Sequence, residues 1–371
     1  MVNIKKLIIH DRKPVIGPDD LRRRFPLSGE DVARVAHFRK QVADILNGVD
    51  GRLLAVVGPC SIHDTRAALD YAERLAGLAG ELEDRLLPVM RVYLEKPRTA
   101  TGWKGLLNDP DLDGSCRISK GLVIARDLLR SITGLGLPVA CEILSPFTPL
   151  YLGDLISWGA IGARTTESQI HREMASGLPF PVGFKNGTDG NLRIAVDAVR
   201  AARYPHRFLS VDKNGRYTSV MAGGNADAHV ILRGGNGRSN YFPEDIRKVE
   251  EMLDKAGLTQ AIAVDCSHAN SGGDHQRQQE GLVTVCRQLA DGNSSIRCIM
   301  LESFLEAGNQ PIPTDLSQLR YGVSVTDKCI DWTTTEYLLR YVHRTMACRG
   351  VGMAQTDLER AHNGDIRCAA M

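Results

Sequence analysis

The chain has 371 residues and a net charge of +2, because 46 lysines and arginines nearly balance 44 aspartates and glutamates; this balance predicts no nucleic-acid partner. No run of about 18 apolar residues occurs, and the start MVNIKKLIIHDRKP lacks a secretory hydrophobic segment, so neither a membrane span nor export is predicted. Nine cysteines, an odd number spread over a long chain, predict a cytoplasmic protein whose thiols are mostly buried.

Residues 1–50 are predicted to form an extension that precedes the main domain. Ser28 and Asp31 have the spacing of a capping box at the start of a helix, and Asn47 with Gly48 ends that helix. Apolar residues recur at helical spacing between these limits, so one face of the helix is expected to pack on the rest of the protein. The residues expected on this face are Val32, Val35, Ala36, Val42, Ile45 and Leu46.

Residues 51–347 are predicted to form one α/β domain, because short apolar runs alternate with longer segments of helical periodicity such as 64–84 and 243–257. Eight such runs favour a parallel (β/α)8 barrel, also called a TIM barrel. A doubly wound sheet is the alternative, although no G-x-G-x-x-G follows the first run. The eight runs are 53–58, 89–95, 139–143, 160–164, 182–186, 229–234, 261–265 and 298–302.

Residues 207–225 interrupt this alternation just before the sixth barrel strand. Two strand-like runs there flank Lys213, Asn214 and Gly215, so an inserted β-hairpin is predicted. An addition of this kind often serves regulation or assembly. Residues 348–371 are polar and weakly periodic, and they are predicted to be a tail outside the barrel.

Four residues with metal-binding side chains are expected at the carboxyl ends of barrel strands. Cys60 follows the first strand, His268 follows the seventh, Glu302 ends the eighth, and Asp327 lies in the loop beyond. These strand ends share one face of a barrel, so the four side chains are expected to meet there as a metal shell. Each residue taken alone is more often structural, and a catalytic pair of Cys60 and His268 is a further alternative.

A second group of residues at the same strand ends is basic. Charges held there, with apolar residues behind them, are costly unless an anion neutralises them, and arginine binds phosphate and carboxylate in a bidentate manner. With a divalent metal and its three acidic ligands, the mouth would carry a charge of about +5. This predicts two phosphorylated substrates, one of them also a carboxylate. The group comprises Arg91, Lys96, Arg98, Arg164, Lys185 and Arg233, with Thr99 beside Arg98.

Seven long stretches of the sequence strongly resemble the microbial type I 3-deoxy-D-arabino-heptulosonate 7-phosphate (DAHP) synthases, and the likeness runs from about residue 20 to about residue 345. The resemblance implies condensation of phosphoenolpyruvate with D-erythrose 4-phosphate, the entry step of the shikimate pathway. The stretches are VVGPCSIHD, RVYLEKPRTATGWKGLLNDPDLDGS, WGAIGARTTESQIHREMASGL, PVGFKNGTDG, ILRGG, VDCSHAN and LESFLEAGNQ.

The resemblance also implies roles for individual residues. Lys96 would protonate the developing alkoxide, and either Glu142 or a metal-bound water would activate the attacking water. His171, in the loop after the fourth strand, is similar to the family's histidine near the reacting sugar. The metal is typically Mn²⁺, with Fe²⁺, Co²⁺ or Zn²⁺ as substitutes, whereas the thiolate alone favours zinc or iron. The implied metal ligands are Cys60, His268, Glu302 and Asp327; the implied phosphoenolpyruvate ligands are Arg91, Lys96, Arg164, Lys185 and Arg233; Arg98 and Thr99 would bind the erythrose phosphate.

Family members are commonly inhibited by an aromatic amino acid, and the resemblance implies an effector pocket here. Three stretches, VIGPDDLRRRFPLS, ADAHVILRGG and YGVSVTD, are closer to the tyrosine-sensitive type, so tyrosine is the first expected effector. Asn236 replaces the family's usual lysine in an altered loop, and Pro179 replaces its usual serine. The implied pocket comprises Pro149, Leu150, Met174, Leu178, Pro179, Phe208, Ser210 and Val220.

Several readings compete with this one. A related synthase that uses arabinose 5-phosphate is the nearest, but KPRT at residues 96–99 argues against it. A simple metal-dependent aldolase would not need so many anion-binding positions. A noncatalytic effector-binding barrel would be favoured by loss of a metal ligand or of Lys96, and none is lost. The resemblance leaves open a homodimer or a homotetramer, and it also leaves open whether Cys329 bonds to Cys60 when metal is absent.

Overall fold

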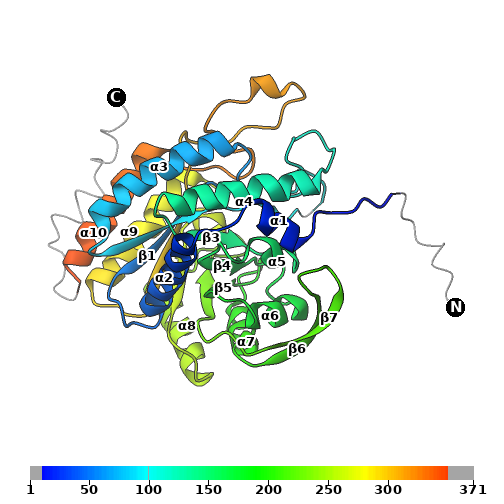
Figure 1. Cartoon of the computed structure of the whole chain (residues 1–371). Helices are drawn as coiled ribbons and strands as arrows, with labels where there is room; N and C mark the ends of the chain where they lie inside the picture. Colours follow the sequence, from blue (N-terminus) through cyan, green and yellow to red (C-terminus); the bar gives the residue numbers. More distant parts are fainter. Residues whose placement is uncertain (1–10, 99, 350–371) are drawn as a thin grey trace.

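The computed structural model describes residues 11–98 and 100–349. A closed barrel of parallel strands forms the centre of the molecule, in the order β1-β10-β9-β8-β5-β4-β3-β2 (Figure 1). This arrangement confirms the predicted (β/α)8 barrel, and the doubly wound alternative is wrong. The barrel strands are β1 (Leu53–Gly58), β2 (Leu86–Arg91), β3 (Val139–Glu142), β4 (Trp158–Ile161), β5 (Val182–Lys185), β8 (His229–Leu232), β9 (Ile262–Asp265) and β10 (Ile296–Glu302).

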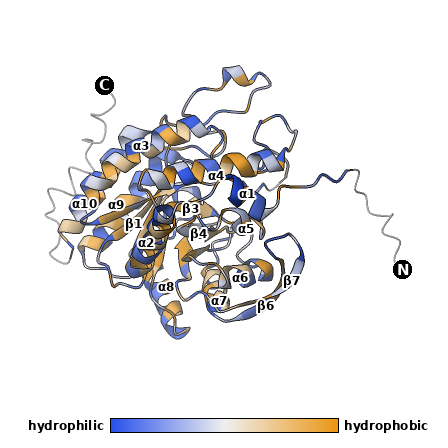
Figure 2. Ribbon diagram, viewed as in Figure 1, coloured by the Kyte–Doolittle hydropathy of each residue, from blue (hydrophilic) through white to orange (hydrophobic). Residues whose placement is uncertain are grey.

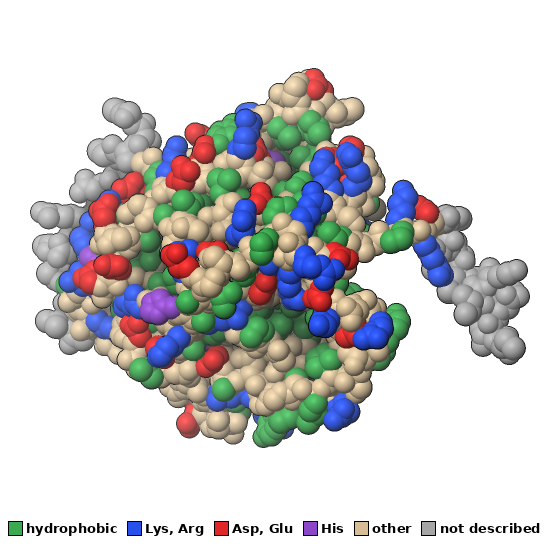
Figure 3. Space-filling model, viewed as in Figure 1, with side chains coloured by type: hydrophobic (Ala, Val, Ile, Leu, Met, Phe, Trp, Pro, Cys, Tyr) green, Lys and Arg blue, Asp and Glu red, His purple; other side chains and the backbone are tan. Residues whose placement is uncertain are grey.

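Helices surround the barrel, and their apolar sides cover strands that are buried along nearly their whole length. Hydrophilic and hydrophobic stretches therefore alternate along the outer helices (Figure 2), and the outer face mixes acidic and basic side chains (Figure 3). None of the described helices combines the length and hydropathy that a membrane span requires. The helices are α1 (Pro18–Arg24), α2 (Gly29–Leu46), α3 (Thr65–Leu82), α4 (Ile118–Gly134), α5 (Thr148–Leu152), α6 (Gln169–Ser176), α7 (Leu192–Ala202), α8 (Pro243–Lys255), α9 (Gln278–Ala290) and α10 (Trp332–Ala347).

Helix α2 closes the amino-terminal end of the barrel. The predicted capping box is present, because the Asp31 backbone N–H donates to Ser28 Oγ at 3.0 Å. Prediction of its buried face was wrong at two positions: Val32 and Ala36 are exposed, and Phe38 is buried instead. Successive residues of a helix are rotated by about 100°, and this rotation places Val32 and Ala36 at the edge of the buried stripe. The buried residues are Val35, Phe38, Val42, Ile45 and Leu46; the last three join the apolar cluster inside the barrel.

Strand β2 differs most from its prediction, because residues 92–95 were expected to continue it. These residues are buried, but the strand ends at Arg91. The backbone of Tyr93 instead accepts from Ile62 N–H at 2.9 Å, and that of Leu94 accepts from Leu107 N–H at 3.1 Å. An apolar run cannot distinguish a strand from a buried connection whose hydrogen bonds go to loops.

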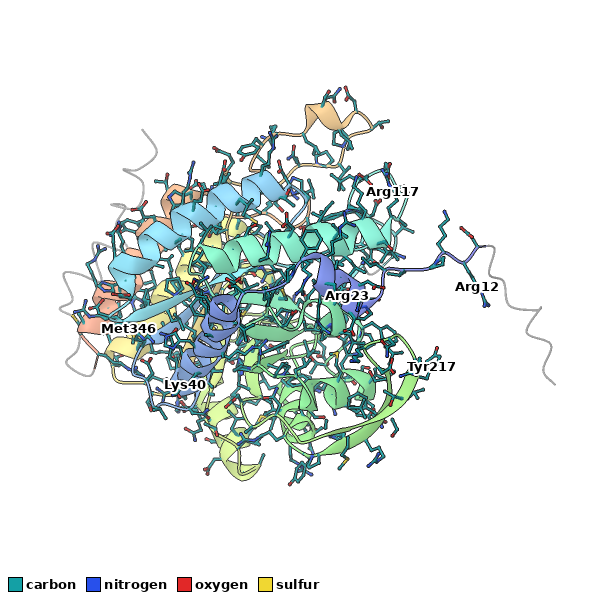
Figure 4. All side chains as sticks on the ribbon, in the orientation of Figure 1. Arg12, Arg23, Lys40, Arg117, Tyr217 and Met346 are labelled. Atoms are coloured by element: carbon teal, nitrogen blue, oxygen red, sulfur yellow. The ribbon has the colours of Figure 1, made fainter. Side chains whose placement is uncertain are left out.

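The inserted hairpin is present as β6 (His206–Val211) and β7 (Tyr217–Ala222), an antiparallel pair outside the barrel. It packs against α6. Its outward side chains include Leu209, Tyr217 and Met221, which are 73%, 81% and 59% exposed; Figure 4 shows Tyr217 at the edge of the molecule. The predicted tail, 348–371, falls almost wholly outside the described residues.

Candidate active site

A cavity of about 640 Å³ opens at the carboxyl ends of the barrel strands. It is built from loops that follow different strands, as the barrel prediction requires. Side chains named from the sequence make up much of its wall. Those that line it are Lys96, Arg98, Glu142, Arg164, Lys185, Arg233, His268, Glu302 and Asp327.

Three of the four predicted metal ligands lie together at this cavity. The Sγ atom of Cys60 and carboxylate oxygens of Glu302 and Asp327 all lie within 4.8 Å of one another. Barrel closure brings the first two together, because Gly58 of β1 pairs with Glu302 of β10. One sulfur and two carboxylate oxygens fit a divalent transition metal.

His268, the fourth predicted ligand, stands beside this group with its Nε2 3.7 Å from Glu302 Oε1. Its other nitrogen, Nδ1, lies 2.7 Å from Ser267 Oγ, and the Ser267 hydroxyl donates to Asp265 Oδ1 at 2.6 Å. This chain of donors places the ring proton on Nδ1 and leaves the Nε2 lone pair free for a metal. His268 has a φ of +57°, a left-handed conformation rare outside glycine that is found at functional sites.

Lys96 contacts two of the metal ligands. Its Nζ donates to Cys60 Sγ at 2.8 Å and to Asp327 Oδ2 at 2.9 Å. Burial alone would lower the pKa of Lys96, but the neighbouring Cys60 and Asp327 raise it overall. Burial, reinforced by Glu302, raises the pKa of Cys60 to about 12. The ammonium therefore stays protonated, and Cys60 would lose its proton on binding a metal.

Two buried ion pairs lie at the floor of the cavity, which Glu302 and Lys185 line. Arg91 Nη2 donates to Glu302 Oε1 at 2.8 Å, and these side chains are 1% and 2% exposed. Lys185 Nζ lies 3.2 Å from Asp265 Oδ2, and these side chains are 4% and 0% exposed. Arg91 therefore lies below the cavity and is absent from its lining. Pairs this deeply buried fix side-chain positions at some cost in stability.

Asp265 is a buried residue next to the site that the sequence reasoning missed. Its Oδ2 lies 3.0 Å from His268 Nδ1 as well as next to Lys185. Burial would raise its pKa, but His268 and Lys185 lower it well below the usual value. The carboxylate thus holds a predicted metal ligand and a predicted anion ligand together, and it cancels one positive charge of the expected total. The sequence offered one sign of this residue, because Asp265 is the last residue of the apolar run at 261–265.

Other predicted residues are placed differently. Thr99 lies outside the described residues. His171 lies in α6 and not in a loop; its Nε2 is 2.8 Å from Leu144 O and its Nδ1 is 2.9 Å from Ser168 Oγ. Its two nitrogens thus both have protein partners, and His171 does not itself line the cavity although Leu144 does.

Glu142 is a cavity residue that the sequence analysis named, whereas other residues of the lining were not named. A Cβ on Gly162, just after the next strand, would lie 2.2 Å from Glu142 Oε1, so a larger residue there would displace the Glu142 carboxylate. His275 and Lys328 also line the cavity. Both lie in long loops after the seventh and eighth barrel strands, where sequence periodicity gives no signal.

Three of the predicted effector residues, Phe208, Ser210 and Val220, lie in the hairpin. Phe208 pairs with Val220 across the two strands, and Met174 lies in α6, against which the hairpin packs. Leu178 and Pro179 line a second cavity of about 330 Å³ at the surface of the barrel. The other six predicted residues are absent from the lining of that cavity.

Comparison with known proteins identifies a family model and several relatives that match most of this chain. The family model described as the DAHP synthetase I family matches residues 27–340. The Tyr-sensitive phospho-2-dehydro-3-deoxyheptonate aldolase of Escherichia coli K12 is 52% identical over 91% of this chain and 95% of its own. The Phe-sensitive protein of the same strain is 51% identical over 92% of this chain and 97% of its own. The Trp-sensitive one is 50% identical over 88% and 93%.

A solved structure agrees with these sequence relatives. Phospho-2-dehydro-3-deoxyheptonate aldolase from Francisella tularensis SCHU S4 superposes with a TM-score of 0.90 at 46% identity, covering 92% of this chain and 99% of that one. The match covers nearly the whole of both chains, so the fold is shared with this relative. The chain belongs to the DAHP synthetase I family.

Proposed function

We propose that this chain condenses phosphoenolpyruvate with D-erythrose 4-phosphate and water to give DAHP and inorganic phosphate, the first step of aromatic amino acid biosynthesis. The observation that carries the proposal is one cavity that joins a candidate metal shell to a ring of cations. Two phosphorylated substrates require such a ring, because arginine and lysine bind their anionic groups. Family membership supports the same reaction.

We divide the cations into two groups. Arg164, Lys185 and Arg233 line the cavity, and we assign them, with Arg91 and Lys96, to the phosphate and carboxylate of phosphoenolpyruvate. Burial lowers the pKa of Arg233, which indicates a partly dehydrated guanidinium suited to an anion. Arg98 is exposed near the mouth, and we assign it, with its neighbour Thr99, to the phosphate of erythrose 4-phosphate.

We propose that Cys60, His268, Glu302 and Asp327 hold a divalent cation, with Mn²⁺ as the first candidate and Fe²⁺, Co²⁺ or Zn²⁺ as substitutes. When bound, such a cation supplies a Lewis acid near the aldehyde oxygen. The free Nε2 of His268 and the grouping of the other three donors support this assignment. The eight cysteines that the structure describes are free thiols, and a thiol ligand is best kept in a reducing compartment, which supports a cytoplasmic location.

In the proposed reaction, C3 of phosphoenolpyruvate forms a bond to the aldehyde carbon of erythrose 4-phosphate. The cations fix the two substrates so that these carbons meet. Lys96 keeps a proton on Nζ and gives it to the oxygen that becomes an alkoxide. Water adds to C2, and phosphate leaves by cleavage of its bond to that carbon. Glu142 is the candidate base among the described residues, because its carboxylate lines the cavity.

Release of inorganic phosphate from phosphoenolpyruvate tests this function. We expect release with erythrose 4-phosphate, no release with arabinose 5-phosphate, and loss of activity with chelator that added Mn²⁺ restores. Preference for arabinose 5-phosphate would establish the related synthase instead. Full activity in chelator would contradict the metal assignment without contradicting the condensation.

We propose feedback inhibition by an aromatic amino acid, with tyrosine as the first effector to test. The relatives named Tyr-, Phe- and Trp-sensitive are 52%, 51% and 50% identical to this chain, so overall identity barely separates the three. Initial rates with each amino acid will decide. Inhibition by phenylalanine or tryptophan but not by tyrosine would overturn the choice.

We propose that the protein is a homodimer or a homotetramer in which the hairpin contacts a second copy. Support comes from the apolar outer side of β6 and β7, where Leu209 and Tyr217 are 73% and 81% exposed. Isolated apolar side chains are common on surfaces, but a paired row suggests an interface. Mass measured under native conditions should drop for Leu209→Lys with Tyr217→Lys; a monomeric unmodified protein would contradict the proposal.

A further inference from the structure

Tyr93 lies at the boundary between the apolar barrel interior and the charged floor of the cavity. Its side chain is 1% exposed and belongs to the interior cluster that includes Val56, Trp158 and Met300. Its backbone carbonyl accepts from Ile62 N–H, in the loop that carries Cys60. The aromatic ring is therefore the last layer of the core beneath the site.

The ring contacts the two cations of the cavity floor. The Arg91 guanidinium carbon lies 3.7 Å from the ring centroid, and Lys185 Nζ lies 5.8 Å from it. Among the described residues, Arg91 is paired with one carboxylate, that of Glu302, and Lys185 with one, that of Asp265. Dehydrated cations over an aromatic face gain from its electron density, and the effect is strongest where water is excluded.

Two polar atoms at this point have no hydrogen-bond partner among the described residues. They are Nη1 of Arg91 and the hydroxyl of Tyr93, and both are buried. An unpartnered Nη1 is a costly arrangement for a resting protein. In a protein that binds an anion here, Nη1 is available as a donor, provided that the guanidinium keeps the orientation in which Nη2 donates to Glu302.

We propose that Tyr93 is a positioning residue whose ring holds Arg91 and Lys185 ready for the anionic groups of phosphoenolpyruvate. This inference rests on the proposed function, because that function supplies the anion. The ring acts through its face and not through its hydroxyl, which has no partner to lose. Phenylalanine should therefore replace tyrosine, and an aliphatic side chain should not.

Three variants test this assignment. We expect Tyr93→Phe to keep kcat and both KM values within about twofold. Tyr93→Leu should raise KM for phosphoenolpyruvate about tenfold, as expected when cation–π contacts are lost from a dehydrated site, while KM for erythrose 4-phosphate stays unchanged. Tyr341→Leu is the matched control, because Tyr341 is also buried with an unpartnered hydroxyl but lies in α10; it should lower Tm without raising KM.

Direct binding separates this inference from the proposed function. Calorimetric titration of each metal-free variant with phosphoenolpyruvate should show the same order of affinity, even if turnover of the unmodified protein fails. Unchanged affinity in folded Tyr93→Leu would overturn the inference. Equal weakening by Tyr93→Phe would overturn it too, because the hydroxyl would then be responsible. If Tyr93→Leu does not fold, Tyr93→Met fills more of the ring volume and replaces it.

Discussion

The two ends of the barrel differ in what they bury. At the carboxyl ends of the strands, Arg91, Glu302, Lys185 and Asp265 are at most 4% exposed, and their charges are paired with one another. At the amino ends, α2 seals the barrel with aliphatic side chains such as Ile45. Buried charge pairs contribute little net stability or cost some, whereas aliphatic burial stabilises at about 25 cal/mol per Å².

This difference indicates a division of labour along the barrel axis. The amino end contributes stability, and the carboxyl end uses part of that stability to hold the buried cations that we propose bind anionic substrates. Changes at the two ends should therefore separate cleanly into effects on activity and effects on stability. The following variants test that separation.

The largest expected effect is on activity at the carboxyl end. Cys60→Ala should abolish metal-dependent turnover and weaken Mn²⁺ binding, because one ligand of the shell is lost, while Tm of the metal-free protein changes little. Cys298→Ala is the matched control, since that thiol is equally buried but belongs to the interior cluster. Full turnover of Cys60→Ala in a chelated, metal-free preparation would contradict the ligand assignment.

A large effect on stability is expected at the amino end. Ile45→Ala should lower the free energy of unfolding by about 2–5 kcal/mol, because it leaves a cavity in a fully buried cluster. KM for phosphoenolpyruvate should not change. Val32→Ala, on the exposed margin of the same helix, should shift the denaturation midpoint far less. A raised KM with unchanged stability in Ile45→Ala would break the separation of the two ends.

His229 should make the amino end sensitive to acid. Its Nε2 accepts from Trp158 Nε1–H at 3.1 Å, its Nδ1 lies 3.0 Å from Asp227 O, and burial lowers its pKa to about 4. The unfolded chain binds this proton near pH 6.5, so the stability contribution is complete above pH 6.5 and is lost as pH falls toward 4. The loss should reach roughly 3 kcal/mol.

The measurement compares unfolding free energies of the metal-free protein and His229→Gln across this pH range. The variant has no titrating group at this position. Its free energy of unfolding should therefore fall by roughly 3 kcal/mol less than that of the unmodified protein as pH falls from 6.5 toward 4. Parallel curves would show that other groups cause the acid sensitivity.

The smallest expected effect concerns the start of α2. Ser28→Ala removes the N-cap acceptor for the Asp31 N–H and should cost about 1 kcal/mol of stability with no change in activity. Ser131→Ala makes the same chemical change inside α4, where the hydroxyl donates back to Asp127 O, and it should be neutral or slightly stabilising. Equal losses in both variants would argue against the capping contribution.

Sequence patterns predicted the barrel well because each strand is buried on both faces and reads as a continuous apolar run. They also placed Cys60, Glu302 and Asp327 near one another, since strand ends converge in a closed barrel. They did not reveal the partners of those residues. The contacts of Asp265 with His268 and Lys185 join two strands and a loop, and such contacts leave no periodic trace in a sequence. His171 was misplaced because a short helix begins at Gln169.

Because the barrel closes between its first and last strands, the residues of the site are synthesised at very different times during translation. Cys60 and Asp327 are 267 residues apart in the chain, and Gly58 pairs directly with Glu302. A growing polypeptide therefore exposes its thiol long before the two carboxylates have been synthesised. The proposed cation site is therefore complete only after Asp327, which lies beyond the last barrel strand, has been synthesised.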